Sequence, residues 1–226
     1  MIRRAALLIM MLASSGAALA GAAPTTWTEG RHYEVVRPMS GVALAPGQAE
    51  VTEVFSYGCP ACAHFAPVVR RLQQSLPKGV KLTFIPASFN AAEDWPMFQR
   101  AYFAAEALGV ADKAHDAMFD AVWKGGELAI VDSSSNRLKD PPPSIETAAH
   151  FYSRVTGVKA DEFVAVAKSF TVEMKMKEAD KFIKAYQVVG TPTILVNRKY
   201  RTDARSAGGY DELIQLVGWL LAKDRT

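Results

Sequence analysis

Hydrophobic and polar positions alternate with different periods along the chain and predict its elements. Residues 50–57 (EVTEVFSY) and 81–87 (KLTFIPA) are rich in β-branched and aromatic residues, which predicts two strands. Residues 59–76, between them, place apolar side chains at helical spacing. A strand–helix–strand order favours parallel pairing of the two strands in an α/β sheet.

The middle of the chain has the pattern of amphipathic helices. Four short helices and a longer one are expected, at residues 97–108, 112–123, 144–156, 161–168 and 171–186. Asp112, Ser144 and Asp161 are the candidate N-caps. Residues 132–143 are polar and end in three prolines, which predicts a connector.

The C-terminal part returns to strands. Residues 193–197 (TILVN) predict a strand, residues 199–202 its hairpin partner, and residues 211–223 a terminal amphipathic helix. A short extended piece is expected earlier, at residues 33–37. The whole order indicates an α/β domain that is interrupted by a block of helices.

Residues 1–20 have the features of an export signal. Two arginines precede an apolar run, and small residues then lead to an A-x-A pattern that ends at Ala20. This order describes a secretory signal peptide, cleaved after Ala20 or Ala23. The unbroken apolar run is shorter than the roughly 20 residues that a membrane anchor needs. We therefore expect an exported protein in a compartment where disulfides form.

Composition narrows the class of protein. Half of the 226 residues are hydrophobic and 22% are charged, which is typical of a globular chain. The formal net charge of +3 is too small to indicate nucleic-acid binding, and two of the arginines lie in the expected signal peptide. Two cysteines in so long a chain exclude a disulfide-rich scaffold.

The two cysteines carry the candidate chemistry, because Cys59-Pro60-Ala61-Cys62 lies where the first strand becomes a helix. The first turn of a helix has unpaired N–H groups and a positive dipole end, which stabilise a thiolate at Cys59 and lower its pKa. Pro60 fits this turn, where its missing N–H costs nothing. Cys62 is within reach one turn later, so the pair can alternate between dithiol and disulfide.

Three other interpretations of the pair are weaker. A structural disulfide across so short a loop gives the least chain-entropy stabilisation. A zinc site needs about four ligands, whereas only His64 lies beside the cysteines, and the other histidines are scattered: His32, His115 and His150. Covalent haem attachment needs a histidine directly after the second cysteine, where the chain has Ala63. The remaining interpretation of the pair is a redox-active CxxC motif.

With these motifs the chain resembles the thioredoxin superfamily, and within it the DsbA-type thiol:disulfide oxidoreductases of the bacterial periplasm. The matching stretches are VFSYGCPAC at residues 54–62, VGTPT at residues 189–193 and VNRKY at residues 196–200. The resemblance implies an α/β protein with a thioredoxin fold at residues 27–90 and 186–226. A helical domain at residues 91–185 would interrupt it.

The resemblance also implies roles for single residues. Cys59 is similar to the exposed, nucleophilic cysteine that forms mixed disulfides, and Cys62 to the buried resolving cysteine. Pro192 is similar to the cis-proline beside the pair, and Thr191 would offer its backbone to an extended peptide. Glu53 matches a buried acid that relays the proton of Cys62. Apolar residues share its strand face, which favours burial over a solvated position.

Two positions differ from the best-known member of that family. Ala61, which with Pro60 tunes the pair, stands where that member has a histidine, so we expect weaker thiolate stabilisation. Thr191 stands where that member has valine. Threonine at this position also occurs in disulfide isomerases and in some reductases, which leaves the direction of exchange open.

The expected function is that of a periplasmic dithiol oxidase. By resemblance, it donates the Cys59–Cys62 disulfide to reduced, folding exported proteins, and a DsbB-type quinone-linked inner-membrane oxidase reoxidises it. We expect a monomer with no metal, no nucleic acid and no cofactor besides this disulfide. A reductase or isomerase of the same fold and a non-catalytic peptide-binding chaperone are the alternatives. The apolar face of residues 171–186 is expected in the core rather than in a substrate groove.

Overall fold

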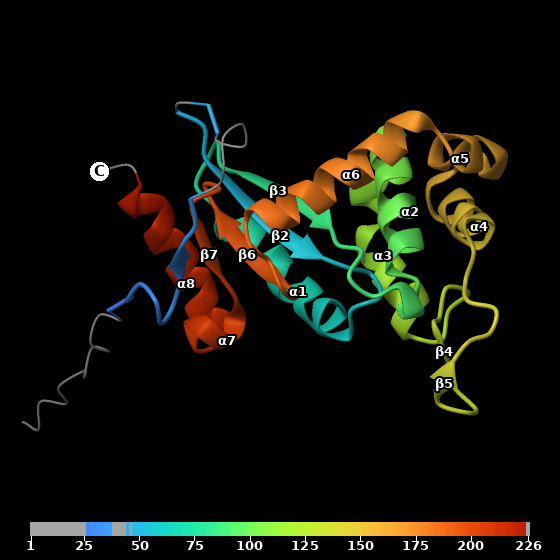
Figure 1. The fold of residues 1–226 in the computed structure, drawn as a ribbon, viewed down its shortest axis with the longest axis horizontal. Coiled ribbons are helices and arrows are strands. Elements are labelled where there is room, and N and C mark those ends of the chain that lie inside the picture. Colours follow the sequence, from blue (N-terminus) through green and yellow to red (C-terminus); the bar gives the residue numbers. More distant parts are fainter. Residues whose placement is uncertain (1–25, 38–43, 46, 225–226) are drawn as a thin grey trace, which may run out of the picture.

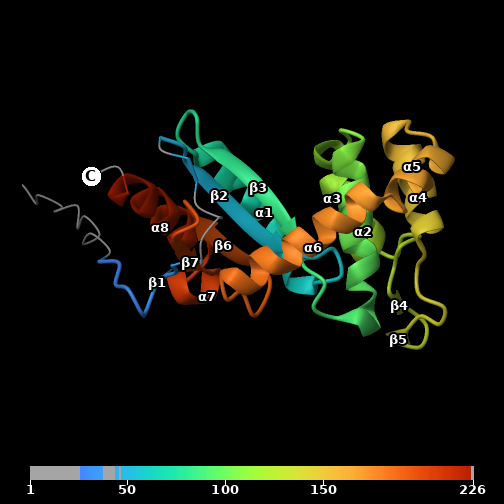
Figure 2. The same cartoon turned by 45° about the horizontal axis from the view of Figure 1, so that its top comes forward.

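The computed structural model describes residues 26–37, 44–45 and 47–224, and the expected signal peptide lies outside this part of the chain. Figure 1 shows a sheet with α1, α7 and α8 beside it, and a group of helices, α2–α5, at the far end of strands β2 and β3. Helix α6 runs from that group back to the sheet, as the turned view in Figure 2 also shows.

The elements follow the predicted order with shifted boundaries. The strands are β1 (Glu34–Val35), β2 (Glu50–Phe55), β3 (Lys81–Pro86), β4 (Val131–Asp132), β5 (Arg137–Leu138), β6 (Thr193–Val196) and β7 (Tyr200–Thr202). The α-helices are α1 (Pro60–Ser75), α2 (Trp95–Ala107), α3 (Ala111–Trp123), α4 (Ile145–Thr156), α5 (Ala160–Ala167), α6 (Phe170–Ala185), α7 (Ala204–Ala207) and α8 (Tyr210–Lys223), and a 3-10 turn covers Ala91–Glu93.

The main sheet has the strand order β1-β7-β6-β2-β3. Strands β2 and β3 pair in parallel, which confirms the prediction from their order along the chain, and the other pairs are antiparallel. Every residue of β2 is buried, because it has a strand on each side and packed side chains on both faces. This central strand leads directly into the cysteine pair.

Helix α1 packs on the sheet through its predicted apolar face. Phe65, Val68 and Leu72 are at most 5% exposed and share a core with residues of α8 and of strands β2 and β6. Burying each of these side chains contributes about 1.5–3 kcal/mol. The same packing fixes the first turn of α1, and with it the cysteine pair.

The helical segment corrects several details of the sequence prediction. Ser144 caps α4 as predicted, by accepting from the Thr147 N–H at 3.2 Å. Asp112 and Asp161 are wrong as N-caps: they lie inside the first turns of α3 and α5, where a negative charge still favours the helix dipole. The connector at 132–143 holds the second strand of a short hairpin, β4–β5.

The expected core face of α6 is confirmed in part. Phe182 and Tyr186 are buried, whereas Met174 is 37% exposed. No helix within the described ranges combines the length and the apolar character that crossing a membrane requires.

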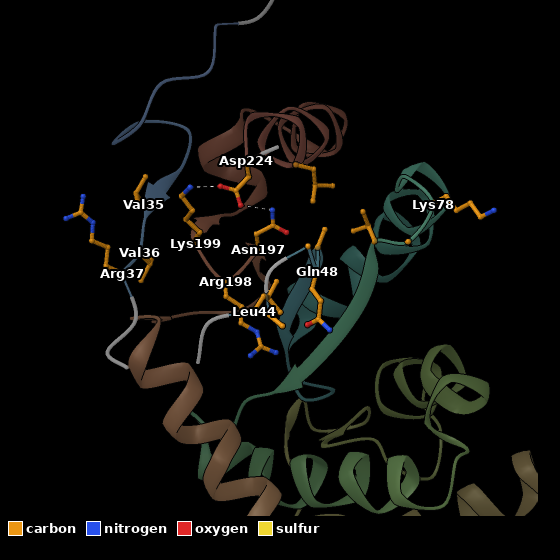
Figure 3. Close-up of a pocket in the computed structure, with 16 residues that line it drawn as sticks. Val35, Val36, Arg37, Leu44, Gln48, Lys78, Asn197, Arg198, Lys199 and Asp224 are labelled. Atoms are coloured by element: carbon orange, nitrogen blue, oxygen red, sulfur yellow. Dashed lines mark hydrogen bonds and ion pairs between the residues drawn. The ribbon is translucent and has the colours of Figure 1, made fainter. Parts of the chain in front are cut away.

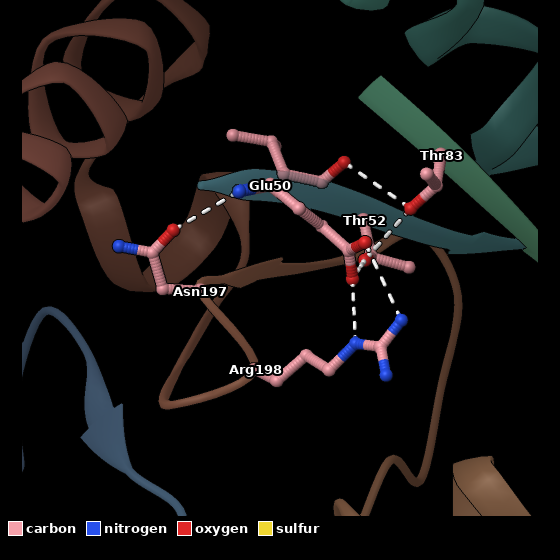
Figure 4. Close-up of polar contacts among 6 residues, drawn as sticks. Glu50, Thr52, Thr83, Asn197 and Arg198 are labelled. Atoms are coloured by element: carbon pink, nitrogen blue, oxygen red, sulfur yellow. Dashed lines mark hydrogen bonds and ion pairs between the residues drawn. The ribbon is translucent and has the colours of Figure 1, made fainter. Parts of the chain in front are cut away.

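A buried polar cluster fastens the β6–β7 turn to the start of β2 (Figure 4). The Glu50 carboxylate accepts from Arg198 Nε at 2.7 Å and from Thr52 Oγ1 at 3.0 Å, and Asn197 exchanges backbone and side-chain bonds with Glu50. Asn197 and Arg198 both adopt left-handed conformations, with φ near 52° and 51°. The Glu50 side chain is only 9% exposed and that of Arg198 28%, so the pair is partly shielded from water and the loss of either partner destabilises the protein.

Candidate active site

Cys59 and Cys62 open helix α1 as the sequence predicts. Cys59 is the N-cap residue, and its sulfur accepts from the Cys62 N–H at 3.4 Å. Both are free thiols. Cys62 is fully buried, and Cys59 is only 5% exposed, so the expectation of an exposed Cys59 is wrong in degree. The loop around Thr191 covers it: the Thr191 carbonyl oxygen lies 3.5 Å from Cys59 Sγ and accepts from it when Cys59 is protonated.

The two thiols have opposite acidities. Hydrogen bonding from Cys62 lowers the pKa of Cys59 to about 6 against the opposing effect of burial, and the Thr191 side chain and the amides of the first turn act in the same direction as Cys62. Burial raises the pKa of Cys62 far above its usual range, and its bond to Cys59 and the nearby Glu53 charge raise it further. At neutral pH the Cys59 thiolate therefore faces a protonated Cys62.

The loop before β6 completes the wall beside Cys59. Its Thr191–Pro192 peptide bond is cis. Thr193 Oγ1 donates to the Gly190 carbonyl at 2.8 Å, and Arg201 holds the chain just before the loop by donating to the Tyr186 carbonyl at 3.0 Å. Thr191 Oγ1 is buried and has no hydrogen-bond partner among the described residues. Because this oxygen is buried beside Cys59, the sulfur of that residue is its nearest possible partner.

Glu53 lies beneath the pair in the middle of the sheet. It is 1% exposed, between its strand partners Phe84 and Ile194, so the expectation of burial is confirmed. Its Oε2 has no hydrogen-bond partner among the described residues. Burial, and next the Cys59 charge, raise its pKa to about 8. At neutral pH this carboxyl group holds a proton within the core.

The helical segment holds Tyr57, two residues before Cys59, through contacts that the sequence patterns did not indicate. Trp123 Nε1 donates to the Tyr57 carbonyl at 2.8 Å, and the Tyr57 hydroxyl bonds to His115 Nδ1 at 2.9 Å. Burial lowers the pKa of His115 to about 4, so this ring is neutral at physiological pH. No local pattern in the sequence marks these contacts, because they join residues more than 50 positions apart.

Gly58 is required by a close approach that the sequence analysis also missed. A Cβ atom at Gly58 would lie 2.6 Å from the Trp95 indole ring, which is far inside van der Waals contact. Trp95 is 8% exposed and is held by its Nε1 bond to Glu93 at 3.1 Å. The indole therefore packs directly against the residue before Cys59.

Replacing Gly58 by alanine is expected to destabilise the protein by about 1–3 kcal/mol, because Trp95 must move from a packed position. Urea unfolding measures this change. Gly218→Ala is the matched control: it lies inside α8 with open space around it, so alanine there should stabilise by about 0.5–1 kcal/mol. Equal effects of the two substitutions would contradict the proposed contact.

A wide hollow of about 950 Å³ lies at the opposite end of the sheet from the cysteines (Figure 3). Lys199 and Asn197 both bond to Asp224 on its wall. Neither cysteine borders it, so the redox chemistry is not placed there. Among the described residues, no group of three or more histidine, cysteine, aspartate or glutamate side chains is arranged to hold a metal ion.

The chain matches known proteins over most of its length. A family model described as thioredoxin matches residues 41–216. The thiol:disulfide interchange protein DsbA of Azotobacter vinelandii is 34% identical over 197 residues, which cover 87% of this chain and 84% of that protein. The protein of the same name from Pseudomonas aeruginosa is 34% identical over 220 residues, or 97% and 96% of the two chains.

Two solved structures extend the likeness to three dimensions. The crystal structure of Pseudomonas aeruginosa DsbA matches with a TM-score of 0.73 at 33% identity, over 88% of this chain and 95% of that one. The crystal structure of the oxidoreductase DsbA from Xylella fastidiosa matches with a TM-score of 0.73 at 31% identity, over 88% and 97%.

Proposed function

Since the chain belongs to the DsbA family of thioredoxin-fold thiol:disulfide oxidoreductases, we propose that it is a dithiol oxidase of exported proteins. Its disulfide form would pass the Cys59–Cys62 bond to reduced polypeptides in the periplasm. A quinone-linked membrane oxidase of the DsbB type would restore that bond. The expected signal peptide and the family support this location and this partner.

The acidity of Cys59 is the observation that carries the direction of exchange. Its pKa of about 6 means that the reduced enzyme gains a stabilised thiolate at neutral pH. Stabilising the reduced form makes the disulfide a stronger oxidant. An acidic Cys59 is also the better leaving group when the mixed disulfide is resolved, which speeds the release of the substrate. Lowered cysteine pKa values occur in oxidases and reductases of this fold, and the lower value favours the oxidase, since the thioredoxin reductant has a pKa of about 7.

The reaction divides into two thiol–disulfide exchanges. A substrate thiolate attacks Cys59 Sγ; a mixed disulfide forms, the Cys59–Cys62 bond breaks, and Cys62 leaves as a thiolate that takes up a proton. A second substrate thiolate then attacks the substrate sulfur of the mixed disulfide and releases the Cys59 thiolate. The substrate loses two electrons and two protons to become a disulfide. The enzyme gains the two electrons and ends with Cys62 as a thiol and Cys59 as a thiolate, so one proton is bound at Cys62 and the other is released to solvent.

Glu53 and the loop before β6 serve these steps. Glu53 is proposed to supply the proton that Cys62 takes up, because it is the buried acid whose charge acts on that thiol. Thr191 and Pro192 are proposed to position an extended peptide against Cys59, since the Thr191 carbonyl already lies 3.5 Å from its sulfur. Pro60 and Ala61 are proposed to tune the pair through the first turn of α1.

Equilibration of the pair with glutathione tests the proposal. We expect a reduction potential less negative than the roughly −180 mV of protein disulfide isomerase. The dithiol and disulfide forms are separated after acid quenching at a series of glutathione ratios. A potential near the roughly −270 mV of thioredoxin would overturn the oxidase and favour the reductase that Thr191 also allows.

A further inference from the structure

A groove of about 670 Å³ adjoins the cysteine pair. Ala61 and Thr191 form its wall next to Cys59. The groove extends from there over the edge of the sheet, between the ends of β1 and β7 and the short helix α7, which are labelled beside one another in Figure 2. A polypeptide whose cysteine meets Cys59 therefore has its neighbouring residues beside this groove.

The charges along the groove do not cancel. Arg31, Arg201 and Arg205 line it together with two acidic residues, Glu34 and Asp203. Glu34 is the cross-strand partner of Arg201, so these two charges offset each other. The carboxylate of Asp203 is used inside the protein, where it accepts from the Ser206 N–H at 2.7 Å as the cap of α7.

The groove keeps a net positive charge, because its three arginines outnumber Glu34 and Asp203. Arg31 and Arg205 are exposed, and neither side chain makes a hydrogen bond or ion pair with another described residue. The stretches outside the described ranges contain no aspartate or glutamate that could pair with them. Two unpaired guanidinium groups therefore face solvent beside the path of the substrate, although the net charge of the chain is only +3.

We propose that Arg31 and Arg205 make this groove select substrate segments with acidic side chains next to the reacting cysteine. The inference rests on the proposed oxidase function and adds a substrate class to it. A guanidinium group pairs with a carboxylate through two parallel N–H···O bonds, which suits an extended peptide that passes within reach. Such pairs are exposed, so they mainly speed the encounter and their effect falls with salt.

The rate of oxidation of three dithiol peptides tests this selection. The peptides share one sequence except at the positions flanking one cysteine, which carry glutamate, glutamine or lysine. We expect the disulfide form of the protein to oxidise the glutamate peptide about fivefold faster than the glutamine peptide, and the lysine peptide slowest. The second-order rate constants come from acid quenching and separation of the oxidised peptide. About 0.5 M salt should remove most of the difference.

Charge variants assign the effect to the two arginines. The R31Q/R205Q double variant should bring the ratio of glutamate to glutamine rates to about one, while R31K/R205K, which keeps both charges, should retain most of the preference. Arg137→Gln, which removes an exposed arginine from the distant β4–β5 hairpin, should leave rates and ratio unchanged. Equal rates for the three peptides, or a ranking that survives in R31Q/R205Q, would overturn the inference and leave the oxidase intact. Failure to oxidise any peptide would overturn both.

Discussion

Replacing Cys59 by serine is expected to abolish disulfide transfer, with a fall in rate of more than about a thousandfold. The serine hydroxyl forms no disulfide, and without one the protein has nothing to donate. The measurement is the rate at which a reduced dithiol peptide is oxidised in a glutathione buffer. A non-catalytic chaperone would instead keep its activity in this variant, so normal function of Cys59→Ser would exclude the proposed oxidase.

Cys62→Ser is the matched control, since it removes a sulfur from the same motif but leaves the acidic thiol in place. The remaining Cys59 thiolate should attack a disulfide-bonded peptide and form a mixed disulfide that no second enzyme thiol can resolve. Mass spectrometry of the protein after acid quenching detects this adduct. Cys59→Ser should form none, because the pKa of Cys62 is raised far above its usual range. An adduct on Cys62 would reverse the assigned roles.

The α/β order with its inserted helices was predictable because local patterns mark its elements, and the resemblance to the DsbA-type proteins then implied the thioredoxin fold. β-Branched and aromatic residues mark β2 and β3, helical spacing marks α1, and the parallel pairing follows from their order. The CxxC motif at a strand–helix junction gave the candidate chemistry for the same reason. Glu53 was expected to be buried because its neighbours on the same strand face are apolar, and it is 1% exposed.

The features that the sequence did not predict are of two kinds. Some are contacts between residues far apart in the chain, and others are helix starts where neighbouring positions are almost equally favourable. The contacts of Tyr57 with Trp123 and of Gly58 with Trp95 join separate elements, and the Glu50–Arg198 pair joins residues 148 positions apart. The covering of Cys59 by the loop at Thr191 is likewise a tertiary effect. Asp112 and Asp161 failed as N-caps because an acidic residue is equally favourable within the first turn.

Replacing Glu53 by glutamine is expected to stabilise the protein by up to about 3 kcal/mol at pH 7. The carboxyl group has a pKa of about 8 in the folded state and about 4.5 when exposed. Below pH 4.5 it is protonated in both states and costs nothing. Between pH 4.5 and 8 the unfolded state ionises while the folded state does not, so the wild type loses stability as pH rises. Glutamine does not ionise, so the free energy of unfolding of the variant does not fall in this way as the pH rises.

Urea unfolding of the disulfide form at pH 4 and pH 7 measures the effect. In that form neither cysteine titrates, so burial, the larger cause of the raised Glu53 pKa, acts alone. The difference between Glu53→Gln and the wild type should be near zero at pH 4 and should grow as the pH rises. A difference that does not depend on pH would mean that Glu53 does not hold a proton in the folded protein.

Glu50→Gln makes the same chemical change three residues earlier on the same strand, and we expect the opposite sign. The Glu50 carboxylate is bound by Arg198 at 2.7 Å and by Thr52 at 3.0 Å, so the protein uses its charge. Removing that charge leaves the Arg198 guanidinium group in the cluster of Figure 4 without the Glu50 carboxylate. The loss should be smaller than the roughly 3–5 kcal/mol of a fully buried pair, because the Arg198 side chain is 28% exposed. Strand β2 thus carries two carboxyl groups in different surroundings: Glu53 is buried and protonated, and Glu50 forms an ion pair. At pH 7, glutamine at position 53 should stabilise the protein and glutamine at position 50 should destabilise it.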